Sequence, residues 1–129
     1  MPRPIQPIMP ASLPPPQGHY VPGLLAGDLL FISGQLPGQG SEAEAGSVFA
    51  DQARQAIAAL LAILREAGGT AGDLLKVTVY LVGVEHWAAF NAIYAQMLGA
   101  AKPARAIVPV PALHHGYLVE IEAIASISR

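Results

Sequence analysis

The chain has 129 residues and a mass of 13.4 kDa, the size of one domain, and its content of 53% hydrophobic and 12% charged residues excludes intrinsic disorder. A net charge of −2 provides no basic field for nucleic acid or an anionic membrane, and the absence of Cys excludes a disulfide frame. No apolar run reaches the length of a membrane span, so a cytoplasmic location is expected. The high apolar content of so short a chain predicts a subunit interface.

The N-terminal part of the chain is rich in proline. Residues 1–17 are predicted to form an arm that runs extended across the surface, because three successive prolines at 14–16 exclude a helix. Residues 24–33 contain two apolar runs around an Ala-Gly-Asp turn, which predicts a β-hairpin. The segment 34–46, with its Gly, Pro and Glu residues, is predicted to be a loop.

Residues 47–67 have the clearest helical pattern in the chain. Apolar side chains recur at spacings of three and four between Phe49 and Leu64. Ser47 is expected to cap the start of this helix, and the pair Gly68-Gly69 is expected to end it.

The remainder of the chain alternates between strand and helix patterns. It predicts a strand at 74–82, a helix at 85–98, and strands at 104–110 and 117–127. The apolar stripe of the second helix comprises Trp87, Phe90, Tyr94 and Met97. Strand–helix–strand units imply parallel pairing with both helices on one face, whereas the last two strands are expected to pair antiparallel. The order β-hairpin, α, β, α, β, β therefore predicts an α+β fold with a mixed sheet.

The last strand alternates between two kinds of side chain. One set is uniformly apolar and suits a face covered by helices: Val119, Ile121, Ala123, Ala125 and Ile127. The other set is mixed: Leu118, Glu120, Glu122, Ile124 and Ser126. Because Leu118 and Ile124 need a cover that a single chain lacks, the sequence predicts oligomerisation through this sheet face.

Two charged residues are candidates for chemistry. Arg105 begins a strand in a part of the chain with few charges, and Arg is suited to two-point recognition of a carboxylate. Glu120 lies among apolar residues, so it is either paired in a structural salt bridge or kept for proton transfer. Spacing alone favours the salt bridge, and Glu122 competes for either role. His114 and His115 are adjacent and would diverge in a strand, so no metal site is expected.

Seven short motifs follow one another along the chain: Gly18-His19-Tyr20, Phe31-Ile32-Ser33-Gly34-Gln35, Gln52-Ala53-Arg54-Gln55-Ala56, Lys76-Val77-Thr78-Val79-Tyr80, Asn91-Ala92-Ile93-Tyr94, Pro103-Ala104-Arg105 and Val119-Glu120-Ile121-Glu122-Ala123-Ile124-Ala125. Together they resemble the RidA/YjgF family of reactive-intermediate (enamine/imine) deaminases. The similarity extends from about residue 18 to the end, and the combination of Ser-Gly-Gln, Pro-Ala-Arg and the Glu-Ile-Glu-Ala-Ile-Ala ending makes it specific.

The resemblance implies a fold, an assembly and a reaction. The fold is the chorismate-mutase-like α+β fold, with residues 1–129 as one domain, and the assembly is a homotrimer with active clefts between subunits. Deaminases of this family hydrolyse small 2-imino or enamine acids to 2-keto acids and ammonia, using no cofactor and no metal. The expected partners are therefore the small acid and further copies of the chain, without nucleic acid or membrane.

The functional positions of the family match residues of this chain. Arg105 matches the residue that clamps the substrate carboxylate, and Glu120 matches the residue that places the water. The substrate-binding positions of the cleft are matched by Tyr20, Ser33, Asn91 and Ile107. Near the cleft the sequence departs from the common family pattern at four positions: His19, Ile107, Pro109 and His114. These departures bear on substrate preference more than on fold.

Two other functions are compatible with the sequence. A non-catalytic protein that binds or senses a small carboxylate, such as a 2-keto acid, would use the same Arg105 clamp. Endoribonuclease activity, ascribed to some relatives, fits less well with a net charge of −2 and few Lys and Arg residues. Steady release of keto acid from an imine would distinguish an enzyme from a binder.

Overall fold

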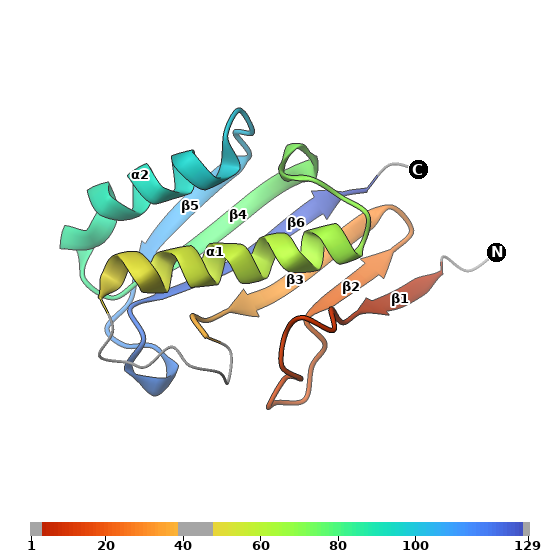
Figure 1. Cartoon of the computed structure of the whole chain (residues 1–129), viewed down its shortest axis with the longest axis horizontal. Coiled ribbons are helices and arrows are strands. Elements are labelled where there is room, and N and C mark those ends of the chain that lie inside the picture. Colours follow the sequence, from red (N-terminus) through yellow and green to blue (C-terminus); the bar gives the residue numbers. More distant parts are fainter. Residues whose placement is uncertain (1–3, 39–47, 128–129) are drawn as a thin grey trace.

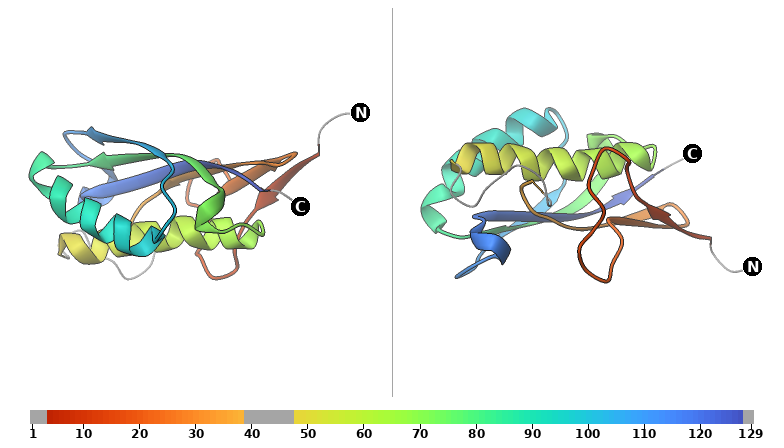
Figure 2. Two further views of the ribbon diagram at one scale, coloured as in Figure 1. Left: turned by 90° about the horizontal axis from the view of Figure 1, so that it is seen from above. Right: turned by 60° about the horizontal axis from the view of Figure 1, so that its bottom comes forward.

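The computed structural model of the chain describes residues 4–38 and 48–127. In this part, one six-stranded sheet has the order β1-β2-β3-β6-β4-β5, and two helices cover one of its faces (Figures 1 and 2). The elements are β1 (Ile5–Ile8), β2 (Gly23–Ala26), β3 (Leu29–Gln35), α1 (Phe49–Glu66), β4 (Leu74–Leu81), α2 (Trp87–Leu98), β5 (Ala104–Pro109) and β6 (Val119–Ser126). The α+β fold class and the placement of both helices on one face are confirmed.

The pairing of the last two strands differs from the prediction. β5 pairs with β4, in parallel, and β6 pairs antiparallel with β3 on one side and β4 on the other. The predicted antiparallel pair of β5 and β6 is therefore wrong. β5 returns beside β4 because α2 forms the crossover between them, and Pro109 suits its edge position because proline lacks the N–H that an inner strand needs.

The N-terminal arm contributes a strand to the sheet. β1 pairs antiparallel with β2 at the opposite edge from β5. Residues 5–8 are extended as expected, but they belong to the sheet rather than only crossing the surface, and the arm turns at residues 11–13, where the N–H of Leu13 donates to the Pro10 carbonyl. Pro7 is tolerated there because an edge strand leaves half of its backbone groups unpaired.

α1 ends as the sequence predicts, while its start differs by two residues. The N–H of Gly68 donates to the Arg65 carbonyl and the N–H of Gly69 donates to the Leu64 carbonyl, each at 2.9 Å. These two bonds form a Schellman motif, and Gly68 adopts the positive φ of +90° that the motif requires. The helix begins at Phe49; the expected cap Ser47 lies outside the described residues.

α2 buries a different stripe from the one expected. Phe90 and Tyr94 are buried as predicted, but Trp87 is 44% exposed and Met97 only half-buried. The residues before Trp87 form a short 3-10 turn (Val84–His86) instead of the first turn of the helix. None of the helices in the described part of the chain is long and apolar enough to cross a membrane.

β6 shows the predicted alternation along its whole length. Its apolar set is buried beneath the helices, and Glu120, Glu122, Ile124 and Ser126 are half-buried on the other face. On the same face, Phe31 lies opposite Ile124, and Val108 lies in the row of Glu120; these two side chains are 42% and 36% exposed. Neither α1 nor α2 lies on this face, which we call the open face (Figure 2).

Candidate functional site

Arg105 is held in place by three residues of α2. It lies on β5, on the helix-covered side of the sheet, where its row continues into the buried Val77. Its Nη1 donates a hydrogen bond to Asn91 Oδ1 at 3.0 Å. Its Cζ lies 4.9 Å from the centre of the Tyr94 ring and 5.8 Å from that of Trp87. These contacts orient the guanidinium without neutralising its charge.

A hollow of about 350 Å³ lies beside this guanidinium. The described residues that line it include two cations, Arg105 and Lys102, and no acidic side chain. Arg105 also forms no ion pair with any acidic residue in the ranges 4–38 and 48–127. A half-buried guanidinium whose protein partners are all neutral is suited to an anionic ligand, and its planar fork matches a carboxylate.

Tyr94 and Trp87 belong to this site although the sequence placed both in the core. Tyr94 is 7% exposed, and its hydroxyl is buried with no hydrogen-bond partner in the part of the chain that the structure describes. Burial raises the pKa of the Tyr94 phenol, while the charge of Arg105 opposes the shift. The spacing of Trp87, Asn91 and Tyr94, four and three residues apart, places them on one helix face and could have identified them.

Glu120 lies on the open face of the sheet, on β6. Its carboxyl group is packed against Gly34 of β3, where any side chain larger than a hydrogen atom would collide with it. Burial raises the pKa of the Glu120 carboxyl, the charge of Glu122 raises it further, and His114 opposes both. Glu122 is itself bound by the Tyr80 hydroxyl, which donates to its Oε1 at 3.0 Å. A carboxylate with a raised pKa is a better proton acceptor near neutral pH.

A second hollow, of about 550 Å³, lies next to Glu120. Tyr20 contributes to it from the segment between the N-terminal arm and β2, and His114 contributes from the turn before β6. Its lining comprises Pro15, Gln17, Gly18, Tyr20, Leu36, His114, His115, Tyr117 and Glu120. The lining of this hollow therefore brings one carboxyl group and two imidazole rings together.

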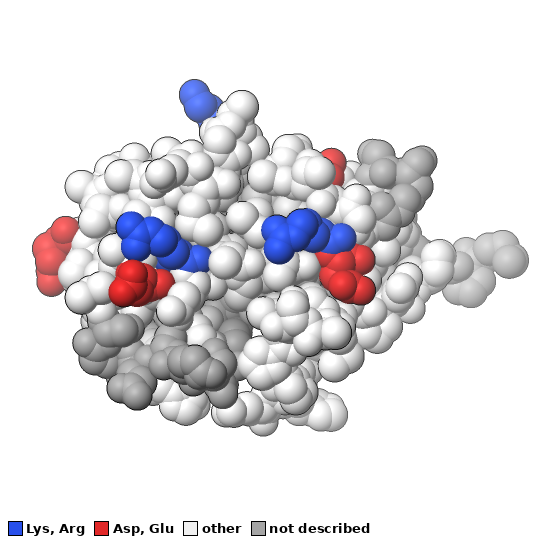
Figure 3. Space-filling model, in the orientation of Figure 1, with Lys and Arg blue, Asp and Glu red and all other residues white. Residues whose placement is uncertain are grey.

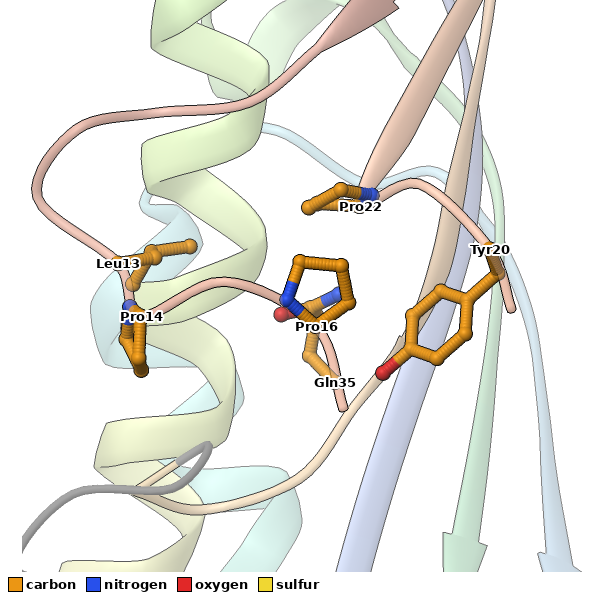
Figure 4. A pocket seen from close by; sticks show the side chains of 6 residues that line it. All are labelled: Leu13, Pro14, Pro16, Tyr20, Pro22 and Gln35. Atoms are coloured by element: carbon orange, nitrogen blue, oxygen red, sulfur yellow. The ribbon is translucent and has the colours of Figure 1, made fainter. Parts of the chain in front are cut away.

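The N-terminal arm positions Tyr20 at this second hollow. Figure 4 shows a small pocket between the arm and β3, lined by Leu13, Pro14, Pro16, Tyr20, Pro22 and Gln35. Its volume of about 10 Å³ leaves room for a water at most, so the arm packs closely here. The Ser33 hydroxyl donates to the Val21 carbonyl at 2.7 Å, which ties β3 to the residue after Tyr20.

The structure thus separates the sequence-predicted site residues into two groups. Arg105 and Asn91 contact each other on the helix-covered face, and Ile107 lies two residues further along β5 on the same face. The second group, on the side of the open face, comprises Tyr20, Ser33 and Glu120. The structural salt bridge that spacing favoured for Glu120 does not form among the described residues, and Arg105 cannot supply it because the two side chains leave opposite faces of the sheet.

Comparison with known proteins identifies the family. The family described as Endoribonuclease L-PSP matches residues 11–127. The chain belongs to this family. The RutC family protein PH0854 of Pyrococcus horikoshii is 42% identical over 120 residues, which cover 92% of this chain and 94% of that protein. The resemblance of the sequence to the RidA/YjgF family is therefore confirmed.

Relatives within this family include proteins with solved structures. TdcF of Escherichia coli, whose name provisionally calls it a reactive intermediate deaminase, is 36% identical over 84% of this chain and 86% of its own length. Its crystal structure with bound serine has a TM-score of 0.88 and 33% identity, covering 95% of this chain and 99% of that one. The E. coli YjgF gene product has a TM-score of 0.85 at 34% identity, covering 94% and 98%.

Proposed function

We propose that this protein hydrolyses small 2-imino and enamine acids to 2-keto acids and ammonia. The observation that carries the proposal is the Arg105 guanidinium, which is half-buried, oriented by Asn91, and without a carboxylate partner among the described residues. Two findings on the relative TdcF support it: its name refers to deamination, and its structure holds serine, which carries an α-carboxylate.

The reaction needs few groups because the substrate is already activated. In a protonated imine the carbon next to the carboxylate is electrophilic, and an enamine becomes such an imine by taking a proton at carbon. Arg105 binds the carboxylate through its two-point fork. Glu120 accepts a proton from the water as the water oxygen bonds to the carbon. The C–N bond then breaks after the nitrogen gains a proton, so that one imine and one water become one keto acid and one ammonia.

A single chain cannot bring these two groups to one substrate, because they lie on opposite faces of its sheet. We therefore propose that the site is shared: Glu120 of one copy faces Arg105 of the next. Such a contact joins two different surfaces, and repeated contacts of this kind form a ring when the rotation between successive copies closes. We propose a ring of three copies, because the sequence resemblance implies a homotrimer. The exposed Phe31 and Val108 on the open face would become covered in this homotrimer.

A non-catalytic binder of 2-keto acids is the second candidate, because the Arg105 clamp alone is sufficient for binding. The family description also mentions an endoribonuclease. The surface gives that activity little support: on the face shown in Figure 3, the Lys and Arg groups over α1 each lie beside an acidic group, so no continuous basic surface is available there for phosphates.

The test is turnover of a defined imine. An amino-acid oxidase would generate 2-iminopropanoate or 2-iminobutanoate in situ, and semicarbazide would compete for the imine that has not yet been hydrolysed. The protein is expected to lower the yield of semicarbazone in proportion to its concentration, and Glu120→Gln is expected to remove this effect while pyruvate still binds. Binding of pyruvate without any acceleration of hydrolysis would instead establish the non-catalytic binder.

A further inference from the structure

The backbone conformation at position 34 does not require a glycine. Among the described residues, the glycines with positive φ are Gly27, Gly38, Gly68, Gly83, Gly99 and Gly116. Gly34 is not one of them, so other residues could adopt its conformation. The restriction at position 34 is steric, because there is no space for a side chain. A Cβ at position 34 would lie 2.5 Å from Glu120 Oε2 and 3.0 Å from Glu120 Cδ.

The local irregularity of β3 brings Gly34 to this place. Ile32 pairs with Ala123 and Gln35 pairs with Ile121, so two residues of β3 lie opposite Glu122 alone. This extra residue is a β-bulge, which changes the direction of the strand and of its side chains. The backbone at Gly34 consequently lies against the side chain of Glu120.

On the β4 side of Glu120, the neighbouring position across the sheet is occupied by an aromatic residue. Tyr80 of β4 lies directly opposite Glu120, and its hydroxyl is bonded to Glu122. Glu120 is therefore bounded by a ring on the β4 side and by the bare Cα of Gly34 on the β3 side. The space left by the absent side chain of Gly34 therefore determines the position of the Glu120 carboxyl group.

We propose that Gly34 is a positioning residue for Glu120: the absence of a side chain at position 34 allows the Glu120 carboxyl group to lie against β3, where it holds the attacking water. This inference rests on the proposed function of Glu120. It assigns to the glycine a role in the geometry of the reaction, separate from the needs of the fold.

The substitution Gly34→Ala tests the role without threatening the fold. The added Cβ collides with the end of a flexible side chain, so the carboxyl group must move by about 1 Å while the backbone stays in place. Gly72→Ala is the matched control, because Gly72 also lacks a positive φ and the nearest atom to its added Cβ is Thr70 Oγ1 at 3.7 Å.

The kinetic test separates positioning from binding. In Gly34→Ala we expect kcat to fall about 10²-fold, since a displacement of about 1 Å at a reacting group has this effect. KM should change by less than about twofold, because the Arg105 clamp is untouched. Combining Gly34→Ala with Glu120→Asp should cause a less than additive loss, because an aspartate oxygen would lie near the present position of Glu120 Cδ, 3.0 Å from the added Cβ, and not at the 2.5 Å of Oε2. Wild-type kcat in Gly34→Ala, or fully additive losses, would overturn the proposal.

A titration keeps this test independent of the deaminase activity. The ¹³C signal of the Glu120 carboxyl, assigned by its loss in Glu120→Gln, reports the pKa directly. Glu122 on β6 and His114 at the hollow act on this pKa; the other titratable groups that face the carboxyl group are Tyr80 on β4 and Tyr20 and His115 at the hollow. In Gly34→Ala, but not in Gly72→Ala, the pKa should fall toward the ordinary glutamate value, because the carboxyl group moves into better solvated surroundings. An unchanged pKa refutes the positioning role; a shifted pKa in a protein that does not deaminate imines refutes only the proposed function.

Discussion

Arg105 and Glu120 point away from each other across one sheet. Arg105 lies in the same row as Val77 and Ala123, both of which are buried beneath the helices. Glu120 lies three residues from Ala123 on β6, and an odd offset along a strand reverses the face. Because the two side chains lie on opposite faces of one chain, a site that needs both must combine Arg105 of one copy with Glu120 of another.

Mixing two inactive variants tests whether the site is shared. Arg105→Ala and Glu120→Gln would each be inactive alone. Unfolded together in equal amounts and refolded, they should recover about one quarter of wild-type activity, because half of the copies supply an intact Arg105 and half of their neighbours an intact Glu120. Activity is measured as keto acid release per site. Recovery near zero would show that both groups serve one site from the same chain.

The Arg105 side chain should be indispensable for the reaction and dispensable for the fold. Losing one partner of a desolvated charge pair costs about 2–5 kcal/mol, and a loss near the middle of that range means that Arg105→Ala should lower kcat/KM for 2-iminopropanoate by roughly 10²–10³-fold. Arg105→Lys should recover little, because an ammonium retains the charge but not the planar fork held by Asn91 and the two rings. Sedimentation and thermal unfolding should match the wild type.

The exposed Arg54, which pairs with Asp51 on α1, provides the control. Arg54→Ala should leave kcat/KM unchanged. Wild-type turnover by Arg105→Ala would refute the assigned mechanism.

The sequence predicted the elements of the fold well because their signals are local. The alternation in β6 and the Gly68-Gly69 stop of α1 each depend on residues a few positions apart. The pairing of β6 between β3 and β4 could not be obtained in this way, because it depends on which strands compete for the centre of the sheet. The arrangement of the site could not be predicted from local sequence signals either. Motifs indicated Arg105 and Glu120, but only the register shows that they occupy opposite faces.

A charge placed on the open face should separate the copies. Ile124 is half-buried there, directly across from the exposed Phe31 of β3. If this face is covered in a trimer, Ile124→Asp forces an unpaired carboxylate into the interface, which is strongly unfavourable. We expect this variant to sediment at the 13.4 kDa mass of one chain at micromolar concentration and to lose deamination.

Val84→Asp is the matched control, since Val84 is 70% exposed and lies in the 3-10 turn before α2. It should retain the wild-type mass. A wild-type protein that sediments as a monomer under these conditions would contradict both the interface and the shared site.

The pH dependence of turnover should report the interaction between Glu120 and Glu122. Glu120 must be ionised to accept a proton, so activity falls as the pH drops through its pKa, which burial and the charge of Glu122 raise. In Glu122→Gln that charge is gone while an amide oxygen still accepts the Tyr80 hydrogen bond. The pKa of Glu120 should therefore fall, and the acid limb of the kcat/KM profile should move to lower pH with the alkaline limb in place. Glu66→Gln, at an exposed position at the end of α1, should leave the profile unchanged. An acid limb that stays in place in Glu122→Gln would mean that another group controls it, and Glu120 would then lose its assignment as the base.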